Sequence, residues 1–303
     1  MTGGAITQRL VEQGHSDVVL KDEPKIVETM HHGKALDLAQ SAAWAGFDSA
    51  VIPTDSWEDT AGSEVVVFTA GAPRKPGQSR EELLNINAGI MREAVTNAAR
   101  HSPEATLIIF ANPMDVLCHV ALEASGFPRQ RVIGQGGMLD SARYRTFVSR
   151  ELGVSIRDVH GYVLGGHTDV TMVPAVSATM VGGMPLTSLL PKERIDALVE
   201  RTMKGGAEVL GLLKTGSAYQ APSVATLQMI EAIVLDQHRL IPCSVLLQGE
   251  YGIKDVFCGT IAKLGTGGVQ QVYEVPLSED ELGKVRAAAE ATRELTGLLE
   301  PAA

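Results

Sequence analysis

The sequence predicts an α/β fold, with a doubly wound parallel sheet in the first part of the chain and an α+β domain in the second. Residues 17–135 alternate strand-like and helix-like stretches, which is the pattern of repeated βαβ units. Two of the strand-like runs, EVVVFTAG and TLIIFANP, are apolar without interruption, as in strands buried on both faces of a parallel sheet. From about residue 140 the alternation stops, so we expect a second domain to begin there.

The chain begins with a glycine turn, a helix and a strand. Gly3 and Gly4 precede apolar residues at helical spacing, and the β-branched run that follows ends at Asp22. In a dinucleotide-binding unit, an acid about twenty residues after the glycines accepts hydrogen bonds from the ribose hydroxyls. Asp22 would then favour NAD over NADP, because a carboxylate repels a 2′-phosphate. The alternative is a solvated loop acid.

Further strands of the first domain are separated by helical stretches such as 82–100. With Val18–Leu20 first, the expected strands are Ala50–Ile52, Glu64–Thr69, Thr106–Ala111 and Arg131–Ile133. In such sheets ligands bind beyond the carboxyl ends of the strands. The segments TAGAPRKPG and ANPMD leave two of these strands at that edge.

The second domain is expected to contain a helix, a strand-and-loop segment, two long amphipathic segments, an antiparallel meander and a final helix. In order, these are Ser141–Leu152, Asp158–Pro174, 192–214, 222–235, Cys243–Val275 and the stretch that begins at the capping box Ser278–Glu281. Strands flank Gly265–Gly268 on both sides, so we interpret it as a hairpin turn and not as a second phosphate loop.

Composition restricts the possible partners. The 303 residues carry a net charge of −10, which argues against general attraction to nucleic acid or to an anionic membrane. The three cysteines lack metal-ligand spacing, and their scatter indicates a reducing compartment. No apolar stretch is long enough to span a bilayer, and the N-terminus lacks a signal pattern. We therefore expect a cytoplasmic protein without a metal site.

His167, in GGHTD, is the candidate general base. A histidine can accept the proton of a secondary alcohol while hydride leaves its carbon, because its pKa lies near working pH. Asp140, in LDSARYR, is the candidate carboxylate that would fix its tautomer and stabilise the imidazolium. Sequence spacing alone cannot show this pair, and a single histidine is more often structural.

Arginines and asparagines lie at the same edge. Arg74 and Arg80 belong to a Gly/Pro-bearing loop, and Arg143 lies one helical turn after Asp140. Guanidinium groups bind carboxylates through paired hydrogen bonds, so several of them suit a dicarboxylate, although each could be an ordinary surface arginine. Asn112 can both donate to and accept from a ligand, although Asn112–Pro113 also reads as a plain turn. Asn87 is a weaker candidate.

Several long motifs, in the correct order, resemble the lactate/malate dehydrogenase superfamily over nearly the whole chain. They are HGKALDL, TAGAPRKPGQSREELLNIN, ANPMDVL, RVIGQGGMLDSARYRTF, GGHTD with MVP, and KTGSAYQAPS. Within that superfamily the chain is most similar to malate dehydrogenases of lactate dehydrogenase-like type. The resemblance implies a Rossmann-type NAD-binding domain and NAD-dependent, reversible oxidation of (S)-malate to oxaloacetate, a step of the tricarboxylic acid cycle. The expected domains are residues 1–138, which bind NAD, and 139–303, which are catalytic.

The resemblance also implies roles for individual residues. His167 would be the proton acceptor with Asp140 as its partner, Arg143 would bind the substrate's C1 carboxylate, and Arg80 would polarise the carbonyl. Arg74 would bind the distal carboxylate; lactate-specific relatives carry glutamine there. The implied cofactor contacts are Gly3, Asp22, Asn87, Phe110, Ala111 and Asn112, and Asn112 would also contact the substrate. Ser217 matches a substrate-pocket hydroxyl, and Asn112–Pro113 is expected to be cis. We expect a small dicarboxylate substrate and a homo-oligomer, either a dimer or a tetramer.

The chain departs from the family pattern in two places. Thr168 replaces a glycine after the histidine, and it would strain the loop by about 1–3 kcal/mol if that position needs positive φ or a close approach of the backbone. The family's first strand and its Gly-x-Gly are also absent. We expect the native chain to begin on the order of ten residues earlier, since the strands on either side of the absent strand would otherwise lie about 9–10 Å apart and unpaired.

Two other functions stay open on the sequence. The substrate could be lactate or another 2-hydroxy acid. Alternatively, the chain could be an inactive truncated remnant without a complete cofactor site.

Overall fold

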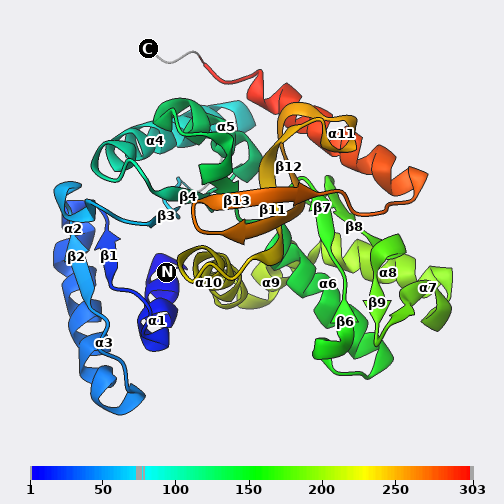
Figure 1. Ribbon diagram of the computed structural model, residues 1–303, viewed down its shortest axis with the longest axis horizontal. Coiled ribbons are helices and arrows are strands. Elements are labelled where there is room, and N and C mark those ends of the chain that lie inside the picture. Colours follow the sequence, from blue (N-terminus) through cyan, green and yellow to red (C-terminus); the bar gives the residue numbers. More distant parts are fainter. Residues whose placement is uncertain (1, 73–76, 78, 301–303) are drawn as a thin grey trace.

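The computed structural model describes residues 2–72, 77 and 79–300, although not the side chain of Arg80 (Figure 1). Helices and strands alternate through the first part of the chain. They are α1 (Thr2–Gln13), β1 (Val18–Lys21), α2 (Pro24–Ile26), the π-helix η1 (Val27–His31), α3 (His32–Ala45), β2 (Val51–Thr54), β3 (Val65–Phe68), α4 (Arg80–His101), β4 (Thr106–Ile109), α5 (Met114–Ser125) and β5 (Val132–Gly134). Each strand expected in the first domain is present, with ends shifted by a few residues.

The second part mixes short strands, helices and a long antiparallel meander. Its elements are α6 (Gly137–Leu152), β6 (Val159–His160), β7 (Val163–Gly165), β8 (Met172–Pro174), β9 (Met180–Val181), β10 (Met184–Pro185), α7 (Leu186–Leu189), α8 (Lys192–Met203), α9 (Gly205–Leu213), α10 (Gln220–Val234), β11 (Arg239–Gln248), β12 (Lys254–Gly265), β13 (Gly268–Tyr273) and α11 (Glu279–Thr296). The predicted meander is confirmed, and its hairpin turn joins β12 to β13.

The parallel strands form two groups. β1 pairs with β2 in one small parallel sheet, and β3, β4 and β5 pair in parallel in another. As expected, β1 and β3 do not pair with each other, and no other described strand lies between them. The second group continues without a break into the antiparallel strands β11, β12, β7 and β8, so both parts of the chain share one sheet. The link between them is Ser244 of β11, which pairs with Gly134 of β5.

Helices bury both faces of the parallel strand β4. On one face of β4, Leu107 and Ile109 pack with α4 and α5, for example with Leu117. On the other face, Ile108 belongs to a cluster that includes Ile230 of α10. Alternate residues of a strand point to opposite faces, which explains why the TLII run is apolar throughout. The doubly wound arrangement predicted for the first domain is therefore present, with a helix of the second part covering one face.

The segment 192–214 is two helices and not one. α8 ends at Met203, and α9 starts at Gly205 after a residue, Lys204, whose ψ of 0° leaves the helical range. The side chain of Arg143 occupies the space beside this break, since a Cβ on Gly205 would lie 3.0 Å from the Arg143 Cδ. The sequence showed amphipathic spacing but not this contact. The capping box at Ser278 and Glu281 is confirmed, with both of its hydrogen bonds formed.

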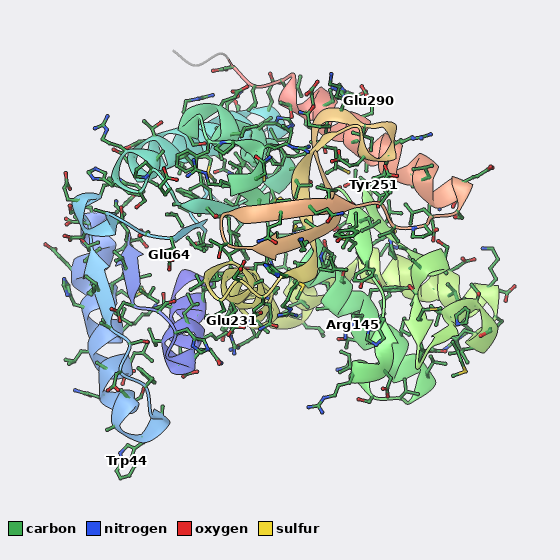
Figure 2. The ribbon with its side chains drawn as sticks, in the orientation of Figure 1. Trp44, Glu64, Arg145, Glu231, Tyr251 and Glu290 are labelled. Carbon is green, nitrogen blue, oxygen red and sulfur yellow. The ribbon has the colours of Figure 1, made fainter. Side chains whose placement is uncertain are left out.

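The outer surface carries one conspicuous aromatic side chain. Figure 2 shows Trp44 projecting from the end of α3, away from the rest of the protein. Its side chain is 95% exposed, and Leu36 on the same helix is 61% exposed.

Among the described residues, no helix has the length and apolar character needed to cross a membrane.

Gly259 of β12 controls how closely the strand β7 can approach. A Cβ on Gly259 would lie 2.5 Å from the backbone oxygen of Gly165, which cannot move without displacing β7. We expect Gly259→Ala to lower the free energy of unfolding by about 1–3 kcal/mol, as overpacking in a core does. Urea denaturation monitored by circular dichroism measures it.

Gly283→Ala is the matched control for this prediction. Gly283 lies within α11 and faces open space, so alanine there should leave stability unchanged or raise it by up to about 1 kcal/mol. Equal stabilities of the two variants would show that the contact between Gly259 and Gly165 does not constrain the sheet.

Candidate active site

Three side chains meet at the start of α6 and the end of β7. His167 Nδ1 lies 2.6 Å from Asp140 Oδ2, and Arg143 Nη1 donates to Asp140 Oδ1 at 2.8 Å. Asp140 and Arg143 lie one turn apart on α6, and His167 follows Gly165 and Gly166 at the end of β7. The structure therefore brings together the predicted general base, its predicted carboxylate and one predicted substrate arginine. His167 is 27 positions away from Asp140 in the chain.

Burial and charge act in opposite directions on His167. Burial would lower the pKa of this imidazole, but the charge and hydrogen bond of Asp140, together with the charge of Asp115, raise the pKa above its ordinary value. The positive charge of Arg143 opposes that rise. With Nδ1 held by Asp140, Nε2 is the ring nitrogen that has no hydrogen-bond partner in the described part of the chain. A carboxylate that stabilises the protonated ring and one ring nitrogen that is available are what a proton acceptor requires.

Glycines allow the backbone to close around His167. A Cβ on Gly136 would lie 3.0 Å from the Cβ of His167 and 2.7 Å from the Met114 Cε. Gly165 has a φ of +78°, a conformation that favours glycine. These positions explain two of the glycines in the motifs RVIGQGGMLD and GGHTD.

The expected strain at Thr168 does not occur. Thr168 is not among the residues with positive φ, so the backbone there does not have the conformation that would favour glycine. Its hydroxyl lies 2.6 Å from the Thr171 hydroxyl, and its carbonyl accepts from the backbone N–H groups of Thr171 and Met172. Threonine at this position therefore adds a local hydrogen bond and costs no backbone strain.

The asparagines lie where strands β3 and β4 end. The Asn112–Pro113 bond is cis, as expected. Asn87 of α4 is buried, and its amide accepts from Ala72 N at 2.7 Å and donates to Asn112 O at 3.0 Å. Asn87 thus joins the two loops at the ligand-binding edge of the sheet. Its direct contact with a cofactor stays a prediction, as does that of Asn112, whose side chain is exposed.

The other predicted cofactor residues lie along the same edge. The backbone N–H groups of Phe110 and Ala111 both donate to Phe68 O at the end of β3. Gly3 lies beside Thr69, the residue that follows β3, because a Cβ on Gly3 would lie 3.3 Å from the Thr69 Oγ1. Glycine there lets α1 approach this strand end closely.

Asp22 directly follows β1, and its side chain is 45% exposed. A histidine that the sequence did not point to, His31, lies beside it, with Nε2 at 3.5 Å from Asp22 Oδ2. Burial lowers the pKa of His31, although the charge of Asp22 acts in the opposite direction. Asp22 therefore faces a neutral imidazole near neutral pH, and its oxygens can accept hydrogen bonds.

Three substrate residues cannot be placed in the same detail. Arg74 lies outside the described residues. Arg80 begins α4, but its side chain is not described. Ser217 is exposed in the segment between α9 and α10. Their predicted roles remain predictions.

Two polar residues near the site were missed on the sequence. Asp115, in the first turn of α5, accepts from the backbone N–H of His167 at 2.9 Å. Gln135 follows β5 and is buried, and its Nε2 has no hydrogen-bond partner among the described residues. Asp115 stands three residues after Asn112 in ANPMD, but nothing in the sequence distinguishes it from a capping acid at a helix start.

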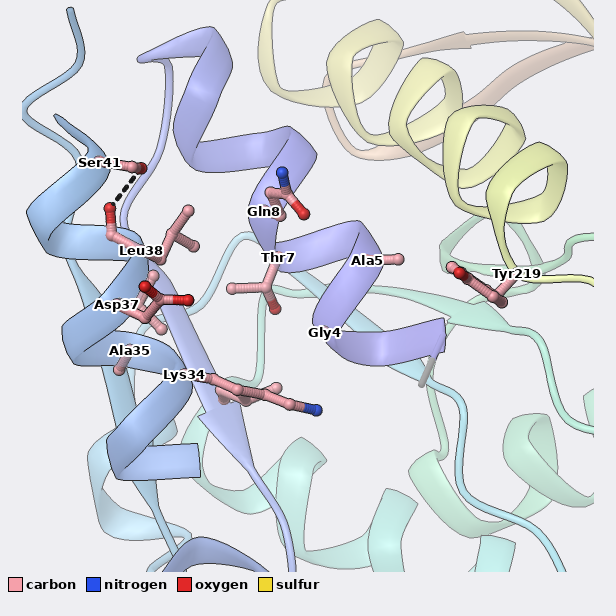
Figure 3. Close-up of a pocket in the computed structure, with 12 residues that line it drawn as sticks. Gly4, Ala5, Thr7, Gln8, Lys34, Ala35, Asp37, Leu38, Ser41 and Tyr219 are labelled. Carbon is pink, nitrogen blue, oxygen red and sulfur yellow. Dashed lines mark hydrogen bonds between the residues drawn. The ribbon is translucent and has the colours of Figure 1, made fainter. Parts of the chain in front are cut away.

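A separate cavity of about 430 Å³ lies between α1, α3 and Tyr219. Figure 3 shows Lys34 extending from α3 toward Gly4 at the start of α1. His167, Asp140 and Arg143 do not line this cavity. We assign the chemistry to the His167 cluster because it contains the groups that can transfer a proton.

The chain matches two family models and many known proteins. The NAD binding domain of lactate/malate dehydrogenase matches residues 1–134, and the alpha/beta C-terminal domain matches residues 137–299. The predicted division at residue 138 stays a prediction. A malate dehydrogenase of Roseiflexus sp. (strain RS-1) is 50% identical over 91% of this chain and 88% of its own. One of Staphylococcus carnosus is 47% identical over 99% and 95%.

Solved structures give the same result. The malate dehydrogenase of Salinibacter ruber has a TM-score of 0.91 at 40% identity, covering 98% of this chain and 94% of its own. A lactate dehydrogenase of Cryptosporidium parvum, complexed with lactic acid and β-nicotinamide adenine dinucleotide, has a TM-score of 0.94 at 37% identity over 100% and 96%. The resemblance inferred from the sequence motifs is confirmed, and the chain belongs to the lactate/malate dehydrogenase family.

Proposed function

We propose that this chain is an NAD-dependent malate dehydrogenase that interconverts (S)-malate and oxaloacetate by hydride transfer. The observation that carries the proposal is the cluster of His167, Asp140 and Arg143, which combines a proton acceptor, its orienting carboxylate and a guanidinium group. The relatives of about 50% identity are named malate dehydrogenases, which supports this substrate.

The residues at the sheet edge fit a nicotinamide dinucleotide. Asp22 has carboxylate oxygens that can accept hydrogen bonds from the ribose hydroxyls. Glycine at position 3 lets the start of α1 lie close to the end of β3. Gln135 has a buried amide N–H at the end of β5 for which the described part of the chain offers no acceptor, and a polar group such as a carboxamide could satisfy it. When bound, NAD accepts the hydride from the substrate.

His167 and its neighbours supply the rest of the chemistry. In malate oxidation the neutral imidazole accepts the hydroxyl proton at Nε2, and Asp140 holds the ring and stabilises the imidazolium that forms. Arg143 binds the substrate's C1 carboxylate with the N–H groups that do not bond Asp140. Arg74 binds the distal carboxylate, and Arg80 polarises the carbonyl in the reverse reaction. Asn112 contacts both the substrate and the nicotinamide.

The assembly and the compartment also belong to this proposal. We infer a homo-oligomer, because Trp44 and Leu36 expose large apolar surfaces on α3 that a second copy would cover. We infer the cytoplasm, because Cys118, Cys243 and Cys258 are all unpaired and buried. Neither nucleic acid nor a membrane is a proposed partner, given the net charge of −10.

Replacing His167 tests the proton acceptor. We expect His167→Asn to reduce turnover by about 10²–10⁴-fold while leaving NADH affinity nearly unchanged, because the cofactor contacts lie elsewhere. Steady-state kinetics and NADH fluorescence titration measure the two effects. His160→Asn, at an exposed position, is the control and should retain activity. Near-normal activity of the His167 variant would mean that another group accepts the proton.

Replacing Asp140 tests the charge beside His167. Malate oxidation requires a neutral imidazole, so kcat/KM rises as pH passes upward through the pKa of His167. Asp140 raises this pKa, so Asp140→Asn should move the rise to lower pH as well as slow the reaction. A pH–rate profile of each variant measures the shift. An unchanged profile would remove Asp140 from this role.

Arg74 tests the choice of substrate. Its guanidinium is proposed to pair with the carboxylate that malate has and lactate lacks, and an unpaired carboxylate in a closed site costs several kcal/mol. Arg74→Gln should lower oxaloacetate turnover by about 10²-fold or more while pyruvate turnover rises or holds. Lys75→Gln removes one positive charge from the next position and should keep the preference for oxaloacetate. Equal losses for both substrates in the Arg74 variant would show that Arg74 supports the loop and does not select.

A further inference from the structure

A second carboxylate, Asp115, lies behind His167 on the side of its backbone. Asp115 Oδ2 accepts the backbone N–H of His167 at 2.9 Å, and Oδ1 accepts the hydroxyl of Ser244 at 2.7 Å. Asp115 is 6% exposed, and Ser244 is completely buried in β11. Both carboxylate oxygens therefore have donors within the protein.

The surrounding packing fixes this arrangement. A Cβ on Gly166, the residue before His167, would lie 3.6 Å from Asp115 Oδ2 and 2.5 Å from the Thr171 hydroxyl. Only glycine lets the chain approach the carboxylate this closely without displacing Thr171. Ser244 stands opposite Gly134, where the two parts of the sheet join. Asp115 thus connects α5, the strand junction and the loop that carries His167.

We propose that Asp115 is a positioning residue for His167. Asp115 holds the backbone N–H of His167 and Asp140 holds its Nδ1, so that the two contacts together present Nε2 to the substrate. The inference rests on the proposed role of His167. Asp115 lies in the first turn of α5, three residues after Asn112, so the same anchor links the place of His167 to that of Asn112. A proton acceptor misplaced by about 1 Å costs on the order of 10²-fold in rate.

The charge of Asp115 also acts on His167. Among the described residues, Asp140, Asp115 and Arg143 are the charged groups that act on this imidazole, and the two carboxylates favour its protonated form while Arg143 opposes it. Burial raises the pKa of Asp115 above its ordinary value, although the hydrogen bonds from Ser244 and His167 act in the opposite direction. A neutral acceptor such as an amide oxygen could take the same backbone N–H. A carboxylate at this buried place, which costs more to desolvate, adds a negative charge beside the imidazolium.

The test compares Asp115→Asn with the unaltered enzyme. Asparagine keeps the shape and one acceptor but removes the charge. We expect kcat/KM for oxaloacetate to fall by about 10- to 100-fold with NADH affinity unchanged. The pH at which malate oxidation begins should move lower. NMR titration of the histidine rings, with the His167 signal identified from its loss in His167→Asn, should show a lowered pKa.

Two further variants complete the test. Glu123→Gln removes an exposed carboxylate from the same helix and should change neither the rate nor the His167 titration. Ser244→Ala removes one donor to Asp115 without touching His167, and it should weaken activity in the same direction. Because both residues act through one network, the effects of Asp115→Asn and Ser244→Ala should not add.

A fall in melting temperature with an unchanged pH profile and an unchanged His167 titration would show that Asp115 only stabilises the fold. That result would overturn the inference. If Asp115→Asn does not fold, Ser244→Ala decides: wild-type kinetics in that variant would also overturn it. The NMR titration reports on His167 whether or not the chain turns over malate. Absence of turnover in the unaltered protein would therefore refute the proposed function and leave this test intact.

Discussion

The carboxylate of Asp140 lies beside the imidazole of His167 at a place that almost no solvent reaches. Much of the surrounding structure serves to stabilise this buried pair. Burying such a pair is favourable only when hydrogen bonds and opposite charge replace the lost hydration. Here His167 and Arg143 occupy the two oxygens, at 2.6 Å and 2.8 Å. Arg143 in turn needs space, which Gly205 provides at the start of α9. The glycine that follows the break between α8 and α9 thus leaves room for the side chain that pairs with Asp140.

The site combines residues from both parts of the chain, so these two parts must keep a fixed position relative to each other. Asn112 follows β4 of the first part, and His167 follows β7 of the second, yet both strands belong to one sheet. A relative movement of the two parts would have to disrupt the pairing of β5 with β11 and the hydrogen bonds of Asp115. The distance between Asn112 and His167 is therefore set by a continuous sheet and not by a flexible linker.

Much of the fold could be predicted from the sequence because burial leaves a local signal. Strands covered on both faces are continuously apolar, as in TLII, and capping residues mark the start of α11. The pairing of His167 with Asp140 leaves no such signal, since it joins residues that are distant in the chain. Asp115 was missed because its partners are a backbone N–H and the distant Ser244. The strain considered at Thr168 depended on a positive φ that the structure does not have, and residue identity alone does not reveal φ.

Fold similarity and substrate preference depend on different parts of this protein. A lactate dehydrogenase and a malate dehydrogenase superpose on the chain about equally well, with TM-scores of 0.94 and 0.91. Proton transfer from a 2-hydroxy acid needs the same base in either case, so the sheet and the His167 cluster do not distinguish the substrates. The distinction requires a group that pairs with one additional carboxylate, and an arginine supplies the two parallel hydrogen bonds that a glutamine cannot. Such a group can change by a single substitution in a loop, because the stability of the fold depends on the buried sheet and its helices.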